Sequence, residues 1–246
     1  MADYDNRALR GSVTTDLIDS GLRAHMLRVY NYMLIGLVLT GLTAWAASVP
    51  PLRDVFFQVN EATGRMGMTG LGWIALLAPL AMVFFLSFGI NRMSVGAAQA
   101  TFWTYAALVG IGIAPILWIY TGASVATTFF ITAATFGAMS LWGYTTKSDL
   151  SGMGSFLFMG LIGILIASVV NMFLHSAMMN WIVSILGVVI FTGLTAYDTQ
   201  YIKEMYTAND DGTVAGRKAI LGALKLYLDF LNLFLFLLRF LGAQRR

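Results

Sequence analysis

Seven apolar stretches, each long enough to cross a lipid bilayer, restrict the fold of this chain more than any other feature. A spanning helix needs about 20 largely apolar residues, because the hydrocarbon core is about 30 Å thick and a helix rises about 1.5 Å per residue. Backbone groups in lipid must be satisfied within the segment, so such stretches predict helices. We therefore predict an all-α membrane protein with spans at about residues 30–49, 71–90, 95–120, 125–144, 152–173, 181–202 and 219–241.

The composition agrees with this class and excludes several others. Charged residues make up 11% of the chain, against about 25% in soluble domains. There is no cysteine, which excludes disulfides, thiolate metal sites and cysteine nucleophiles. Two histidines are too few for a typical multi-histidine metal site, and no phosphate-binding loop is present. We therefore expect no bound cofactor, and no nucleic acid as a partner, with lipid as the surrounding medium.

Lysine and arginine residues predict how the chain is oriented. Residues 1–28 are expected to form a polar cytosolic tail and residues 29–246 the transmembrane domain, because the N-terminus lacks the apolar core of a signal peptide. With seven spans and a cytosolic N-terminus, the inner side holds Arg7, Arg10, Arg23, Arg28, Arg92, Lys147, Lys203, Arg217, Lys218 and Lys225, and the outer side holds Arg53, Arg65, Arg239, Arg245 and Arg246. This bias toward the inner side follows the positive-inside rule.

Two acidic residues, Asp198 and Asp229, lie inside strongly apolar stretches, whereas the other ten lie in the tail, in loops or at span ends. A charge at the bilayer centre costs roughly 2.5–3.5 kcal/mol on insertion scales, so such residues usually face a protein interior and usually serve a function. The sixth and seventh spans run antiparallel and are joined by one short loop. The two carboxyl groups are therefore expected at a similar depth in the cytosolic half of the membrane.

Two neighbouring carboxylates in a low dielectric cannot both ionise easily, and they tend to share a proton. Protonated, the pair would hold two helices together; ionised, it would repel itself or attract a cation such as Ca²⁺, which prefers oxygen ligands. The pair therefore predicts a pH-sensitive ion pathway with a direct Ca²⁺ contact. The alternative is a structural polar cluster that keeps helices in register.

Several polar residues are candidates to support this pair. Lys225 and Asn232 lie about one turn from Asp229 on the same helix face, and Thr195 flanks Asp198. Asn171 is expected to be buried late in the fifth span. Arg92, at the cytosolic end of the second span, is interpreted as a topology determinant that could also reach the aspartates as a counter-ion.

Three stretches of the chain resemble the transmembrane Bax inhibitor motif family. They are Gly193-Leu194-Thr195-Ala196-Tyr197-Asp198-Thr199-Gln200, Leu226-Tyr227-Leu228-Asp229-Phe230-Leu231-Asn232-Leu233-Phe234 and Gly143-Tyr144-Thr145-Thr146-Lys147-Ser148-Asp149-Leu150. The resemblance implies a seven-helix bundle with the last helix at its centre, a pH-sensitive Ca²⁺ leak, and Asp198 and Asp229 as the paired pH sensors. Family members can carry a run of basic residues in the second span, and here Arg92 is the remaining basic candidate. The short tail is similar to that of bacterial members, which implies the inner membrane.

Two rival functions remain beside a Ca²⁺ leak. Some bacterial relatives resemble modulators of a membrane-bound quality-control protease, so the chain could act by binding such a partner through its tail without conducting ions. An intramembrane aspartyl protease also pairs two aspartates on neighbouring spans. Tyr197-Asp198 fits that pattern, but the glycine expected two residues before the second aspartate is replaced by Tyr227, and no proline follows residue 115. We therefore expect a protein that is not an enzyme.

Overall fold

The computed structural model describes the backbone of residues 2–59 and 66–245, and the side chains of residues 20–59 and 66–245. Within these ranges the chain is almost entirely helical. The elements are α1 (Ala2–Ser48), α2 (Leu52–Phe56), β1 (Phe57–Val59), β2 (Met66–Met68), α3 (Gly70–Gly89), the 3₁₀ turn η1 (Ile90–Arg92), α4 (Val95–Ile113), α5 (Ile116–Ile119), α6 (Gly122–Thr145), α7 (Ser151–Leu174), α8 (Ala177–Glu204) and α9 (Gly212–Leu241).

Seven of the described helices are long and apolar enough to cross a membrane, which confirms the predicted fold class. The predicted span at about residues 95–120 is divided near Pro115 into α4 and α5, because proline has no N–H for a helical hydrogen bond and clashes with the preceding turn. The first predicted span lies within α1, a helix that runs without a break from Ala2 to Ser48. The tail predicted for residues 1–28 stays a prediction, since most of its side chains lie outside the described residues.

The start of the last helix was predicted wrongly, seven residues too late. The last span was predicted to begin at about residue 219, but α9 already begins at Gly212. Asp211 explains the difference, because its carboxylate accepts a hydrogen bond from the N–H of Val214 at 2.7 Å and caps the helix. The additional two turns extend α9 beyond the apolar core on its N-terminal side.

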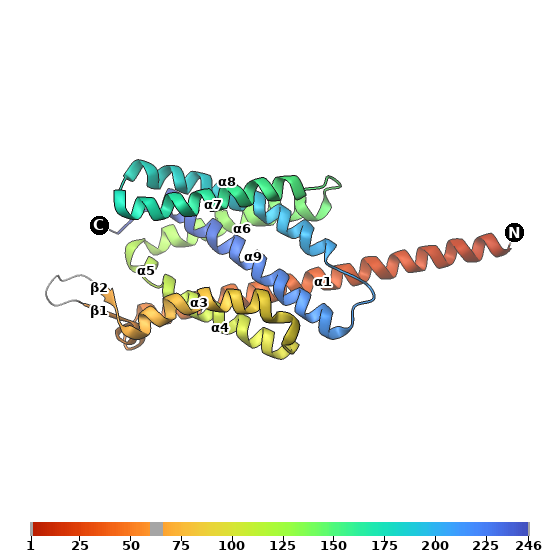
Figure 1. Cartoon of the computed structure of the whole chain (residues 1–246), viewed down its shortest axis with the longest axis horizontal. Helices are drawn as coiled ribbons and strands as arrows, with labels where there is room; N and C mark the ends of the chain where they lie inside the picture. The colour runs from red at the N-terminus through yellow and green to blue at the C-terminus, as the bar shows by residue number, and fades with distance from the viewer. Residues whose placement is uncertain (1, 60–65, 246) are drawn as a thin grey trace.

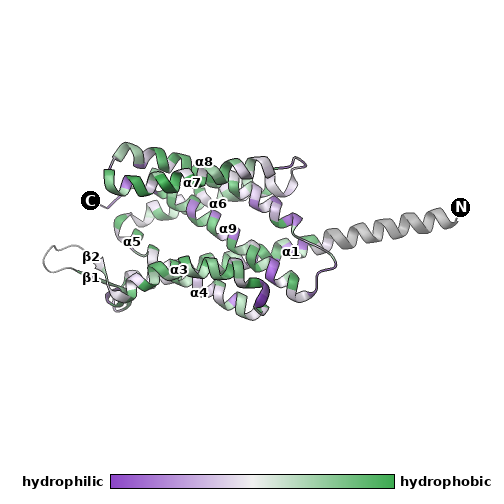
Figure 2. Ribbon diagram, viewed as in Figure 1, coloured by the Kyte–Doolittle hydropathy of each residue, from purple (hydrophilic) through white to green (hydrophobic). Residues whose placement is uncertain are grey.

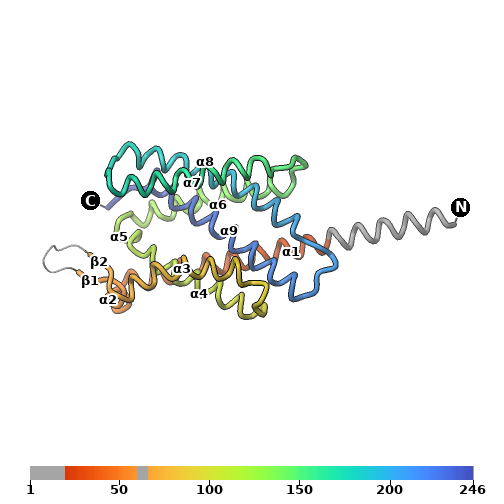
Figure 3. Tube along the Cα trace, viewed as in Figure 1, coloured from red at the N-terminus to blue at the C-terminus, as the bar shows by residue number. Residues whose placement is uncertain are grey.

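Helix α9 occupies the centre of the bundle, as predicted. In Figures 1 and 3 it runs diagonally between the pair α7 and α8 on one side and the pair α3 and α4 on the other. It packs against α8, α1, α6 and α4. In its apolar segment 67% of the residues are buried, against 11–33% for the other six spans. The ring of Tyr227 lies at this centre, in edge contact with Phe102 and Tyr105.

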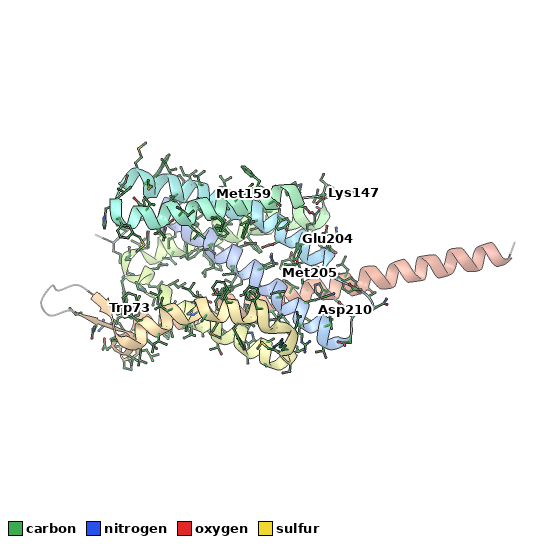
Figure 4. All side chains as sticks on the ribbon, in the orientation of Figure 1. Trp73, Lys147, Met159, Glu204, Met205 and Asp210 are labelled. Carbon is green, nitrogen blue, oxygen red and sulfur yellow. The ribbon has the colours of Figure 1, made fainter. Side chains whose placement is uncertain are left out.

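Polar residues gather at the two ends of the bundle, as Figure 2 shows by the green middle and the purple ends. Lys147, Glu204 and Asp210 lie at one end, and Trp73 lies toward the other (Figure 4). Strands β1 and β2 form a small antiparallel hairpin at the Trp73 end, with Phe57 opposite Met68. This hairpin lies between the first and second predicted spans. Short purple stretches also interrupt α9 inside the bundle (Figure 2).

The contact between α6 and α8 depends on the absence of a side chain at Gly143. A Cβ added there would lie 2.8 Å from the Cα of Ala196, closer than real Cβ atoms approach a neighbouring helix backbone. We expect Gly143→Ala to lower the free energy of unfolding by about 1–3 kcal/mol, because the two backbones must separate. Denaturant unfolding in detergent micelles measures this change.

Gly137 on the same helix is the matched control. A Cβ added there meets nothing within 4 Å, so Gly137→Ala should leave stability unchanged or raise it slightly through helix propensity. Equal losses for the two variants would contradict close backbone contact at Gly143.

Candidate functional site

Helices α8 and α9 run antiparallel with a register that their close contacts define. A Cβ added at Gly222 on α9 would lie 3.1 Å from a side-chain carbon of Ile202 on α8. Farther along, Gly187 on α8 faces the ring of Phe236 on α9. In this register, the residue of α9 opposite Asp198 is Lys225, and Asp229 lies one turn farther toward the centre. Asp198 and Asp229 thus come from facing helices, as predicted. Lys225, which precedes Asp229 by one turn of α9, lies directly opposite Asp198.

Asp198 and Lys225 form an ion pair inside the bundle. The Nζ of Lys225 donates a hydrogen bond to Oδ1 of Asp198 at 3.1 Å. The same ammonium lies 4.9 Å from the centre of the Tyr201 ring, within the range of a cation–π contact. Asp198 is 8% exposed. The carboxylate and the ring lie three residues apart on α8, so one face of that helix holds the ammonium from two sides.

Asp229 is more deeply buried and less completely paired. It is 4% exposed, and its carboxyl group interacts with the carboxyl group of Asp198 and with the ammonium group of Lys225. Its Oδ2 atom has no hydrogen-bond partner among the described protein groups. Buried polar atoms are nearly always hydrogen-bonded, so an unpartnered carboxyl oxygen requires an explanation such as a water molecule, a proton or an ion.

A cavity of about 620 Å³ opens onto these two carboxyl groups. Helix α7 packs along α8, but among the described residues its contacts with α9 are few, and the cavity fills the space between α7 and α9. Its wall is mixed, with apolar side chains and a smaller number of polar ones. The polar lining residues are Ser155, Ser168, Tyr197, Asp198, Lys225, Asp229 and Asn232.

The structure brings some of the predicted supporting residues to this cavity and not others. Asn232 lines it, and its Nδ2 donates to the carbonyl of Leu228 at 2.8 Å. Thr195 is fully buried beside the pair, where its hydroxyl donates to the carbonyl of Phe191 at 2.7 Å. Asn171 lies late in the fifth span, near the end of α7, as predicted, but it is half-buried and does not line the cavity.

That position gives Asn171 a local role: its Oδ1 accepts from the N–H of Ser176 at 2.9 Å, in the turn before α8. The suggestion that Arg92 could reach the aspartates is also corrected. Arg92 is exposed in η1 and does not line the cavity. The cation that meets Asp198 is Lys225, one turn before Asp229 on α9.

Two features of the surroundings were not found from the sequence. Tyr201 was missed although its position three residues after Asp198 on one helix is a local signal. A chain of hydroxyl contacts was also missed, in which Ser140 on α6 lies 2.5 Å from the Tyr30 hydroxyl on α1 and 2.9 Å from Thr199 Oγ1 on α8. Nothing in the local sequence pairs residues so far apart.

The loop before α7 is fixed to the end of α8 by Gln200. Its Oε1 accepts from the N–H of Leu150 at 2.9 Å, and its Nε2 donates to the carbonyl of Ser148 at 2.8 Å. At the tip of this loop, hydrogen bonds from Ser151 lower the pKa of the exposed Asp149 carboxyl. The first turn of α7 is therefore held against α8, on the side of the cavity that Gly154 and Tyr197 line.

Comparisons with known proteins agree on one family. The sequence model of the family described as "Inhibitor of apoptosis-promoting Bax1" matches residues 22–246. An inner membrane protein of Escherichia coli strain K12, YbhL, is 47% identical over 92% of this chain and 94% of its own length. An uncharacterized protein of Rickettsia prowazekii is 46% identical over the whole of both chains. A membrane protein of Streptococcus pyogenes is 36% identical over 92% of this chain and 95% of its own length.

The charged lining of the cavity predicts that water reaches it, because isolated charged groups are not stable in a dry apolar space. The native chain has no cysteine, so a single introduced thiol reports on access. We expect Asn232→Cys, and separately Ser155→Cys, to react with a small water-soluble cationic thiosulfonate at least about tenfold faster than a thiol in the packed core.

Thr132→Cys is the control, because Thr132 on α6 is 0% exposed. The reaction is followed by mass spectrometry of the intact protein. Equal and slow reaction at all three positions would mean that the cavity is closed to water.

Proposed function

This chain belongs to the Bax1-inhibitor family of membrane proteins, and on that premise we propose that it is a pH-sensitive Ca²⁺ leak protein. In this proposal Asp198 and Asp229 form the pH-sensitive gate and the Ca²⁺ contact. The observation that carries it is the meeting of two buried carboxyl groups from facing helices at the wall of a 620 Å³ cavity. A purely structural polar cluster does not need such a cavity.

The charge of the cluster depends on a single proton. Lys225 and an ionised Asp198 neutralise one another, so the cluster is neutral when Asp229 is protonated and carries one negative charge when Asp229 is ionised. A negative charge in a cavity inside the bundle attracts cations more strongly than one in bulk water, because the interaction grows as the effective dielectric constant falls. Proton release would therefore both loosen the contact between α8 and α9 and create a position for a cation.

The small number of oxygen ligands favours weak, transient Ca²⁺ binding over tight binding. Ca²⁺ takes six to eight oxygen ligands in proteins. No group of three or more acidic, histidine or cysteine side chains gathers anywhere in the described part of the chain. Two carboxylates, the Asn232 side chain and water would complete a loose shell at most. Such a site holds Ca²⁺ weakly enough to release it, as conduction requires.

The same geometry argues against an intramembrane aspartyl protease. Catalytic aspartates of that class share one proton and activate a water molecule between them. Here the Lys225 ammonium is bound to Asp198 at 3.1 Å, which neutralises one of the two carboxylates. We therefore propose a role that is not enzymatic.

The two histidines lie away from the pair, whereas tyrosine and lysine side chains lie beside it. Tyr201 and Lys225 face Asp198 directly. His25 is buried between α1 and the end of α8, beside the Tyr206 ring. His175 lies at the exposed end of α7. A pH response that depends on the aspartates can thus be separated from a histidine response by substitution at the aspartates alone.

The proposed location is the bacterial inner membrane, with the N-terminus in the cytosol. The printed description of the E. coli relative, an inner membrane protein, supports this location. The bias of lysine and arginine toward one side of the predicted spans supports the orientation. The aspartate pair would then lie nearer the cytosolic side.

The test is Ca²⁺ uptake into proteoliposomes across about pH 6–8, where a coupled carboxyl pair can titrate. We expect flux by the unmodified protein to change with pH, because one proton changes the charge of the cluster. Asp198→Asn and Asp229→Asn should each reduce this pH response to less than about twofold, since neither variant retains two ionisable carboxyl groups at the site. Asp210→Asn is the control. Asp210 lies in the loop before α9 and pairs with Lys218 of α9, outside the cavity.

An equal pH response of Ca²⁺ flux in all four proteins would show that these aspartates do not form the gate. Absence of any protein-dependent flux would contradict the leak itself. The rival proposal, a regulatory partner of a membrane-bound protease, would then be tested by deleting residues 1–20 and measuring association with that protease. Deletion of this tail should abolish association in that case and leave ion flux unaffected in the leak proposal.

A further inference from the structure

We propose that the Lys225 ammonium is a built-in competitor for the divalent cation at the Asp198–Asp229 pair, and that it sets the affinity of the site. The inference rests on the proposed function, because it assumes that a cation reaches this pair. The proposal concerns one side chain, which the sequence counted among the inner-side cations and also placed about one turn from Asp229. In the structure this side chain lines the cavity and is bonded to the Asp198 carboxylate.

The first step of the argument is the position of the charge. Lys225 Nζ lies 3.1 Å from Asp198 Oδ1, at the carboxylate oxygen that a cation entering the cavity would also contact. An ammonium group offers donors only and compensates one negative charge. Among the described residues that line the cavity, Lys225 is the one cation. Any cation that binds both carboxylates must therefore displace it or tolerate its repulsion.

The second step is the charge balance. With both carboxylates ionised and Lys225 in place, the cluster carries one negative charge, and a bound Ca²⁺ leaves one positive charge in the cavity. Without the ammonium, the two carboxylates balance a divalent ion fully. Removal of the Lys225 positive charge at this distance should raise the affinity for a divalent cation several-fold to many-fold, even at the screened dielectric of a wet site. Lys225 thus keeps the pair from holding a divalent ion tightly.

The third step is a second position for the lysine. Its side chain is 36% exposed, and its Nζ already lies 4.9 Å from the centre of the Tyr201 ring. A lysine released from Asp198 can keep this cation–π contact while the carboxylate turns to a metal ion. The four-carbon stem is flexible, so the exchange needs no movement of the helix backbone. The charged and titratable groups that face Lys225 are Asp198, Asp229 and Tyr201.

The test measures ion binding without conduction. Tb³⁺, a luminescent substitute for Ca²⁺ with the same preference for oxygen ligands, is titrated into the full-length protein in detergent at neutral pH. Tyrosine excitation then reports on bound Tb³⁺, since the Tyr201 ring lies beside the site. Added Ca²⁺ should displace the signal. The double variant Asp198→Asn with Asp229→Asn gives the background from binding elsewhere.

We expect Lys225→Gln to lower the half-saturating Tb³⁺ and Ca²⁺ concentrations by about tenfold, because the competing charge is gone. Lys225→Arg keeps the charge and should stay within about twofold of the unmodified protein. Lys218→Gln is the matched control, since it removes a positive charge two turns earlier on α9 that pairs with Asp210 outside the cavity. Its binding should be unchanged. Lys225→Met, which also lacks the charge but keeps an unbranched stem, replaces the glutamine variant if that variant does not fold.

Each result either supports or overturns the inference. Tighter binding by the folded neutral variant of Lys225, with unchanged binding by Lys218→Gln, supports it. Unchanged or weaker binding by folded Lys225→Gln or Lys225→Met overturns it, as does the absence of specific binding in every protein. The failure of the leak is distinguishable: tighter binding without any flux leaves the competitor in place and removes conduction. Flux with no effect of Lys225 substitution on ion binding supports the leak and overturns the competitor role of Lys225.

Discussion

Two carboxyl groups and one ammonium group lie between helices that are otherwise apolar, and this cluster determines how the bundle must be built. Charges are costly in hydrocarbon, so a helix that carries Lys225, Asp229 and Asn232 on neighbouring turns is stable only if protein or water surrounds it. Helix α9 meets this condition by lying at the centre of the bundle, in contact with α1, α4, α6 and α8. The other six spans have a smaller share of buried residues than α9.

Helix α7 is the exception that creates the cavity. It packs on α8 and leaves one side of α9 uncovered at the level of the aspartates. Small and hydroxyl-bearing residues of α7, among them Gly154, Ser155 and Ser168, face this space. A bulkier α7 in contact with α9 would have to exclude water from Asp198 and Asp229 and would leave their charges without solvation. The central position of α9 and the open side toward α7 are therefore two consequences of the same buried charges.

The sequence predicts the spans well because apolar length is a local property that lipid enforces. It also predicts that Asp198 and Asp229 belong to facing helices, because one short loop joins the two spans. The start of α9 was missed because capping by Asp211 depends on geometry that composition does not show. The choice between Arg92 and Lys225 as the cation near Asp198 was beyond the sequence for a related reason: it depends on the relative position of α8 and α9, which packing at Gly187 and Gly222 sets.

A structural polar cluster and a functional one differ in how completely their atoms are paired. Clusters that hold helices in register satisfy each buried donor and acceptor, as Thr40 does by its contacts with Gly36, Ala106 and the Tyr227 hydroxyl. Asp229 Oδ2 lacks a protein partner at 4% exposure of its residue. Buried ion pairs contribute little to stability compared with apolar packing, so stability alone does not account for the aspartates. The unpaired oxygen, the cavity beside it and the partly exposed Lys225 side chain that lines the same cavity together favour a site that exchanges protons and cations.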